Sequence, residues 1–252
     1  MIGDPDAAPS FPMLGIGDVM TGVHAAAAIG FALLYRERTG RGQHLDISLL
    51  DSYFHCHDVN VQLYSASRGA IEPNRSGSHH YAVSPLGLFK GKDRYLFIIA
   101  LDHQWPLLCK AIGRPELADD ARYDTNAKRT ERMEEVVALI EGWLASTPDD
   151  EAALRSLEEA RVPCAPVLSI AEAVAHPHLR QRKTIRTIED RLLGELAIPG
   201  MPLRFSEFPE LLELEAPLLG EHNEEILGGL LQYDTGRIEA LAADGVLVRG
   251  DT

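Results

Sequence analysis

Residues 15–42 read GIGDVMTGVHAAAAIGFALLYRERTGRG, and this stretch decides how the first part of the chain folds. Alanine and glycine fill its middle, so we predict a slim helix over about residues 19–38 that packs closely against a neighbour. Asp18 is the predicted N-cap and Gly40 the predicted C-terminal stop. Free N–H groups and the helix dipole favour a negative charge at this helix end. The Asp18 carboxylate is therefore expected to be ionised, and it is a cap, a base or a nucleophile.

The composition excludes several function classes. The 252 residues carry a net charge of −14, which argues against a nucleic-acid partner. The three cysteines have no CxxC spacing, which gives no metal or disulfide signal and indicates a reducing, cytoplasmic location. No secretory leader is visible in MIGDPDAAPSFP at the start. The apolar stretch 23–35 is shorter than the roughly 20 residues that cross a bilayer, so we expect no membrane partner.

The remaining pattern mixes helices and strands, typical of an α/β protein. A Gly/Ser-rich stretch, a Lys-Gly-Lys-Asp turn and two capping signals (Thr147–Pro148 and Ser169–Glu172) punctuate it. We predict strands at 44–48 and 162–168, strand pairs within 86–100 and 184–199, and helices at 49–67, 102–112, 126–145, 148–159, 170–176 and 220–231, with a short helix near the end.

Composition shifts divide the chain into four segments. We expect a helical segment of a large domain (residues 1–68), a linker or active-site loop (69–84), a small α/β domain (85–205) and a C-terminal segment that returns to the large domain (206–252). The chain has no run of alternating strands and helices and no glycine-rich nucleotide fingerprint. The first helix has little sheet to pack on, so the sequence is interpreted as the later part of a larger fold.

Four motifs together resemble the class III CoA-transferases, the CaiB/BaiF type that includes formyl-CoA transferases. They are the Gly-Asp pair before the small-residue helix, RERTGRGQ at 36–43 with LDISLLD at 45–51, RVPCAPVLS at 161–169 with HPHL at 176–179, and APLLGEHNEEIL at 216–227. The resemblance extends from Gly3 to about Leu231.

The resemblance implies a fold, a reaction and an assembly. The chain would be the C-terminal portion of the class III fold without its N-terminal nucleotide-fold half, Met1 would lie inside that longer fold, and the dimer would be interlocked. Asp18 matches the family's nucleophile, which attacks an acyl-CoA thioester and passes CoA to a carboxylic acid through an anhydride. CoA thioesters are then substrates, and no permanently bound cofactor is expected. The partner is a second copy or the N-terminal half.

Five further residues are candidates for substrate or CoA binding. Gly15 and Gly17 would let the backbone approach a ligand, or simply form a turn into the helix. In the loop NRSGSHHYAVSP, Gly77, Ser78 and His79 occupy the place of a glycine-rich active-site loop in the family. That loop would shield the anhydride from water; a plain interdomain linker is the alternative.

Other interpretations stay open beside the transferase. His55, His57, His79 and His80 suggest a metal, but they lack a carboxylate or cysteine at suitable spacing, and we predict none. His24 does not share a helical face with Asp18 and is expected in a core or interface. An α-methylacyl-CoA racemase-like isomerase would use Asp and His on an α-proton, although Val-Met-Thr-Gly follows Asp18 here. A catalytically inactive assembly partner is the third possibility. The acyl donor and acceptor are not determined.

Overall fold

The computed structural model describes residues 2–208 and 215–250. It contains two compact units, Met1–Val167 and Leu168–Thr252. Met1 and parts of the expected C-terminal segment, 209–214 and 251–252, lie outside the described residues. The four-segment division of the chain stays a prediction.

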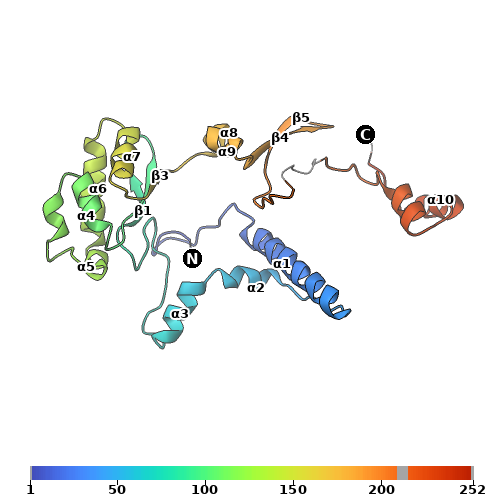
Figure 1. Ribbon diagram of the computed structural model, residues 1–252, viewed down its shortest axis with the longest axis horizontal. Helices are drawn as coiled ribbons and strands as arrows, with labels where there is room; N and C mark the ends of the chain where they lie inside the picture. The colour runs from blue at the N-terminus through green and yellow to red at the C-terminus, as the bar shows by residue number, and fades with distance from the viewer. Residues whose placement is uncertain (1, 209–214, 251–252) are drawn as a thin grey trace. The chain divides into compact units, whose positions relative to one another are not determined.

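The first unit holds three helices followed by a small mixed domain (Figure 1). The three helices are α1 (Ile16–Thr39), α2 (Leu49–His55) and α3 (Asp58–Ala66). The rest comprises β1 (Leu86–Lys90), β2 (Tyr95–Ile99), α4 (Trp105–Ala111), the 3₁₀ turn η1 (Pro115–Ala118), α5 (Asn126–Glu131), α6 (Met133–Ser146), α7 (Asp150–Glu159) and β3 (Cys164–Pro166).

The small domain is built on a three-stranded antiparallel sheet in the order β1-β2-β3. Leu88 pairs with Phe97, and Phe97 pairs with Ala165 on its other side. Side chains alternate along β2, so Leu96 and Ile98 point into the core and are fully buried. Helices α4, α6 and α7 supply the other side of this core, which includes Trp105, Leu108, Cys109, Val136, Ile140, Leu144, Ala153 and Leu157.

Helix α1 packs on α2 and has no buried residue of its own. It ends as predicted at Gly40, whose φ of 70° is left-handed and whose N–H donates to the Arg36 carbonyl. Of the described residues in the three helices, Ser52 of α2 is buried. Large apolar side chains stay exposed on each helix, among them Phe31 (72%), Leu50 (73%) and Tyr64 (54%).

Length and composition alone would let α1 span a membrane. It has 24 residues, and its most apolar window has a mean hydropathy of 1.5. Residues 23–35 by themselves are too short, but the helix extends beyond them at both ends. The core helix of a soluble protein and a signal sequence satisfy the same criteria, so the absence of a membrane partner stays a prediction.

The second unit is a chain of small elements. It contains α8 (Ile170–Ala175), α9 (Pro177–Gln181), the antiparallel pair β4 (Ile185–Asp190) and β5 (Gly194–Pro199), a π-helical turn η2 (Glu225–Leu230) and α10 (Thr235–Ala243). The predicted capping box is confirmed: the Ser169 hydroxyl accepts from the Glu172 N–H, and the Glu172 carboxylate accepts from the Ser169 N–H.

Two helices predicted as continuous are interrupted, and one predicted N-cap is wrong. The expected helix 49–67 breaks at Cys56 and His57, and the expected helix 126–145 breaks at Arg132. Helix α7 begins at Asp150 because Asp149 is its N-cap and accepts from the Ala152 N–H at 2.7 Å. Thr147 was the expected cap, but its hydroxyl instead donates to the Leu144 carbonyl and closes the end of α6.

The predicted strand at 44–48 is also absent from the described structure. These residues form no helix or strand before α2 begins at Leu49. A strand needs a neighbour to satisfy its backbone donors and acceptors. Neither described sheet, β1-β2-β3 or β4-β5, includes residues 44–48. The alternating pattern alone therefore did not produce a strand.

Candidate functional site

Asp18 lies in the first turn of α1 rather than at its N-cap. The helix begins at Ile16, and Gly15 occupies the N-cap position without a side-chain cap. The Gly15 carbonyl already accepts from the Val19 N–H at 2.8 Å. The prediction that Asp18 caps a helix beginning near Val19 is therefore wrong, because the chain enters helical geometry upstream of it.

The Asp18 carboxylate is accessible. The residue is exposed and, within the part of the chain that the structure describes, its side chain forms no hydrogen bond or ion pair. It lies at the N-terminal end of α1, where the first N–H groups of a helix have no acceptor within the helix. A side chain that caps nothing and pairs with nothing leaves both carboxylate oxygens available to a substrate, which is what a nucleophile needs.

Gly15 and Gly17 keep the start of α1 slim on two sides. A Cβ at Gly15 would lie 3.5 Å from Asp18 Oδ2, which is ordinary van der Waals contact. A Cβ at Gly17 would lie 4.0 Å from the Tyr53 Cβ, which marks where α1 approaches α2. Both positions adjoin Asp18, and whether either contacts CoA stays a prediction.

His24 faces α2, as expected for an interface histidine. Its Nδ1 lies 2.7 Å from the Met20 carbonyl within α1. Its ring also meets the His55 ring edge-on, with centroids 5.6 Å apart. The imidazole is thus engaged between helices, and the neighbouring Thr21 hydroxyl donates to the Gly17 carbonyl at 2.7 Å.

Gly77 sits where only glycine fits comfortably. Its φ is +65°, and a Cβ would come within 2.7 Å of Asp4 Oδ1. Its N–H donates to the Gly3 carbonyl at 3.1 Å. The loop is thereby joined to the N-terminal segment that leads into α1, and no hydrogen bond among the described residues joins it directly to Asp18.

Ser78 and His79 are tied to the start of the small domain. The Ser78 carbonyl accepts from the Leu88 N–H at 2.9 Å, and His79 forms an isolated β-bridge with Gly87. The His79 ring packs against Phe89 with centroids 4.9 Å apart. Burial lowers the pKa of His79, although Glu141 acts in the opposite direction. His79 is therefore a neutral, packed imidazole at neutral pH.

The four histidines considered for a metal each have another neighbour. His55 meets His24, His79 meets Phe89, and His80 stacks on Tyr81 with centroids 4.9 Å apart. His57 bonds to Asn60. The described residues contain no group of three or more His, Cys, Asp and Glu side chains that could hold a metal ion.

The cysteines do not offer an alternative nucleophile in the core. Burial raises the pKa of the Cys109 thiol to about 12 and that of Cys164 to about 11. A thiol with so high a pKa is almost entirely protonated at neutral pH and reacts slowly. These two side chains act as small apolar residues beside the sheet.

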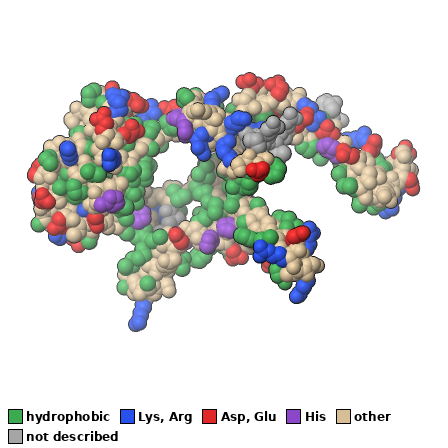
Figure 2. Space-filling view, in the orientation of Figure 1, with side chains coloured by type: hydrophobic (Ala, Val, Ile, Leu, Met, Phe, Trp, Pro, Cys, Tyr) green, Lys and Arg blue, Asp and Glu red, His purple; other side chains and the backbone are tan. Residues whose placement is uncertain are grey.

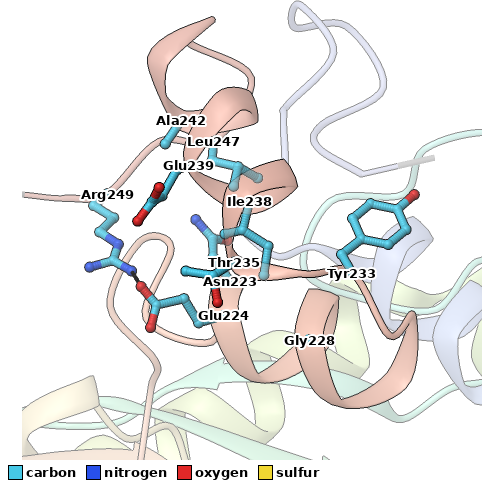
Figure 3. Close-up of a pocket in the computed structure, with 10 residues that line it drawn as sticks. All are labelled: Asn223, Glu224, Gly228, Tyr233, Thr235, Ile238, Glu239, Ala242, Leu247 and Arg249. Carbon is cyan, nitrogen blue, oxygen red and sulfur yellow. Dashed lines mark hydrogen bonds and ion pairs between the residues drawn. The ribbon is translucent and has the colours of Figure 1, made fainter.

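A cavity of about 650 Å³ lies in the second unit, between η2 and α10 (Figure 3). At its edge Arg249 pairs with Glu224, and the carboxylate of Glu239 and the ring of Tyr233 also line it. None of the site residues predicted from the sequence is part of it. The residues that line the cavity all belong to the second unit.

Sequence reasoning missed the residues that hold the 69–84 loop. Arg75 donates to the carbonyls of Ala7 and Pro5, at 2.6 and 3.0 Å. Tyr81 donates to Asn60 at 3.0 Å. Such contacts link residues far apart in the sequence, and no local pattern signals them.

Comparison with known proteins identifies the family. The sequence model of CoA-transferase family III matches residues 1–223. The chain is 32% identical to succinyl-CoA:glutarate CoA-transferase of Mus musculus, over 99% of this chain and 57% of that protein. It is 33% identical to formyl-CoA:oxalate CoA-transferase of Streptomyces avermitilis, over 97% of this chain and 63% of that protein. The chain thus spans less than two thirds of the length of either relative.

A solved structure agrees with the sequence comparison. A CaiB/BaiF family protein from Brucella suis superposes with a TM-score of 0.71 and 30% identity, over 90% of this chain and 58% of that one. The mixed helix-and-sheet fold and the matched sequence together show that this chain belongs to CoA-transferase family III.

Proposed function

We propose that this chain transfers CoA from an acyl-CoA to a carboxylic acid, with Asp18 as the covalent nucleophile. The observation that carries the proposal is the exposed, unpartnered Asp18 carboxylate in the first turn of α1. Membership of CoA-transferase family III supports the reaction class. The relatives named above act with succinyl-CoA or formyl-CoA and with glutarate or oxalate, so short acyl-CoA esters and dicarboxylic acids are the proposed substrates.

The reaction needs a carboxylate because its steps alternate between a thioester, in which sulfur is bonded to the acyl carbon, and an anhydride, in which a carboxylate oxygen takes its place. An Asp18 oxygen attacks the donor thioester carbonyl, the C–S bond breaks, and CoA leaves as a thiolate. That thiolate attacks the aspartyl carbonyl of the mixed anhydride, which releases the donor acid and leaves CoA on Asp18 as a thioester. The acceptor carboxylate then displaces the thiolate, which returns to the acceptor acyl carbon and frees Asp18.

The helix end supports these steps electrostatically. In the resting state the first-turn N–H groups stabilise the negative carboxylate. As the tetrahedral intermediates form on either side of the anhydride, the same donors can stabilise the oxyanion, as preorganised N–H groups do in acyl transfer. Gly15, which has no side chain, adjoins Oδ2 of Asp18.

Hydroxylamine trapping tests the proposal. The protein is incubated with succinyl-CoA or formyl-CoA, quenched with hydroxylamine and analysed as intact protein and peptides by mass spectrometry. We expect a hydroxamate at Asp18 that is absent from Asp18→Asn. Asp58→Asn is the matched control, since Asp58 is also exposed and lies in the first turn of a helix. Equal labelling of wild type and Asp18→Asn would refute the proposal.

A homodimer and a cytoplasmic location belong to the same proposal. Exposed apolar side chains on α1 to α3 support an association, because soluble monomers rarely leave large contiguous apolar patches uncovered. Such green side chains are visible on the surface in Figure 2. Sedimentation equilibrium of the purified chain should give a dimer mass; a compact monomer at micromolar concentration would contradict the dimer.

A further inference from the structure

The loop of residues 69–84 is fastened at both ends. Near its start the Arg75 guanidinium donates to two carbonyls of the N-terminal segment, at 2.6 and 3.0 Å. Near its end the Asn126 side-chain amide donates to the Ala82 carbonyl at 2.8 Å and accepts from the Ser84 N–H at 3.0 Å. Between these two anchors, a third contact connects the loop to α3.

This third contact is a chain of hydrogen bonds through Asn60. The Tyr81 hydroxyl donates to Asn60 Oδ1 at 3.0 Å, and Asn60 Nδ2 lies 3.2 Å from His57 Nδ1. An amide nitrogen can only donate, so His57 Nδ1 accepts in this arrangement and its proton lies on Nε2. All three side chains are half-buried, and Asn60 uses both ends of its amide.

The chain of contacts continues to α2. The His57 ring meets the ring of Tyr53 edge-on, with centroids 6.1 Å apart, and lies 5.9 Å from that of Phe54. Tyr53 belongs to α2, which packs on α1, and its Cβ lies 4.0 Å from the place that a Cβ would take at Gly17, the residue before Asp18. The contacts of Tyr81 thus lead through Asn60 and His57 to α2, the helix on which α1 packs.

We propose that Asn60 is a positioning residue, which sets the place of the 69–84 loop by holding Tyr81 and His57 together. What this positioning does for catalysis rests on the proposed function. In the proposed mechanism, water that reaches the acyl-Asp18 anhydride would attack a carbonyl and yield the free acid and a free Asp18 carboxylate, so CoA is lost without transfer. The family resemblance implies that this loop shields the anhydride, so a loop held in place would exclude that water and a loosened loop would admit it.

Hydrogen–deuterium exchange of the full chain tests the tether without any substrate. Tyr81→Phe and Asn60→Ala should each speed exchange of the loop amides by between about twofold and tenfold, the range that one net hydrogen bond contributes to an opening equilibrium. Combining them should add little, because both remove the same bond. Tyr64→Phe is the control: it removes a hydroxyl from a 54% exposed side chain of α3. Loop exchange in Tyr81→Phe equal to wild type would overturn the tether.

The ratio of hydrolysis to CoA transfer tests the consequence. With succinyl-CoA and glutarate, Tyr81→Phe should raise free CoA formed per acyl-CoA product by a similar factor, while Tyr64→Phe should not. Faster loop exchange with an unchanged ratio would overturn the positioning role. A wild-type chain that forms no acyl adduct would instead refute the proposed function, and the exchange comparison would still decide whether Asn60 holds the loop.

Discussion

The small domain buries its large apolar side chains, whereas the three N-terminal helices leave many of theirs exposed. Around β1 to β3, side chains such as Phe89 and Leu96 are fully buried, and a continuous core connects the sheet to α4, α6 and α7. Helix α1 has no buried residue, although it is the longest described helix. The proposed chemistry lies on these helices, and the folding energy is concentrated in the small domain.

This contrast predicts that shortening an apolar side chain to alanine lowers stability far more in the small domain than in the N-terminal helices, and this is the largest effect that we expect. Leu96→Ala removes a fully buried side chain from the central strand and should lower the free energy of unfolding by about 3 kcal/mol. Phe31→Ala removes a side chain that is 72% exposed and should change it little. Urea denaturation measures both, and similar losses would show that α1 is covered in solution.

Replacing the buried arginine that joins the 69–84 loop to the core should lower the free energy of unfolding by a smaller amount. Arg129 is fully buried, lies 4.9 Å from the Trp105 ring, and donates to the carbonyls of Ser84 and Tyr123, both at 2.8 Å. Arg129→Met fills a similar volume but leaves those carbonyls unsatisfied, at a cost of about 2 to 3 kcal/mol. The exposed Arg155 on α7 gives the control, Arg155→Met, which should leave the urea midpoint nearly unchanged.

Asp150 should make part of this stability dependent on pH. Its burial would raise its pKa, but three backbone N–H donors lower the pKa overall; they belong to Asp93, Lys92 and Arg94. Because the folded pKa is depressed, the stabilisation is present above the unfolded pKa of about 3.9 and is lost as pH falls through the folded pKa.

The corresponding variant is Asp150→Asn. At pH 7 this variant should have a free energy of unfolding about 1 to 2 kcal/mol below that of wild type. This difference should narrow as acid protonates Asp150 in the wild-type protein. Glu151→Gln, an exposed neighbour on the same helix, controls for a general charge effect. A gap that is constant between pH 7 and pH 3 would contradict this role of Asp150.

The smallest loss of stability is expected in the second unit, from a change to the capping box of α8. Ser169→Ala removes the hydroxyl that accepts from the Glu172 N–H and should cost about 1 kcal/mol. Glu172→Gln keeps a side-chain carbonyl and should cost less. Native-state hydrogen exchange of residues 170–175 measures the change. Equal protection in wild type and Ser169→Ala would mean that the cap adds nothing.

Much of this fold is predictable because its signals are local. The hairpin within 86–100, the glycine stop of α1 and the capping box at Ser169 all depend on residues that are close in the sequence. Choices between neighbouring caps were harder. Asp149 and Thr147 are both good N-caps by type, and only the bond from Thr147 to the end of α6 decides between them.

The candidate site also has features that local sequence predicts and features that it does not. The Gly-Asp pair placed Asp18 at the start of α1, but not within its first turn, because the helix starts with Gly15 as its N-cap. Arg75 and Asn60, which also hold the loop, have no sequence signature, since their partners lie far along the chain. The strand predicted at 44–48 failed for the related reason that pairing depends on a neighbour.

Following oxygen through one turnover tests the nucleophilic role of Asp18 most directly. In the proposed sequence the donor acid leaves with one Asp18 oxygen, and the acceptor replaces it with one of its own. Turnover of succinyl-CoA with glutarate labelled with heavy oxygen in its carboxylates should therefore place the label in the peptide that contains Asp18. Glutaryl-CoA formed while that peptide stays unlabelled would contradict covalent catalysis by Asp18.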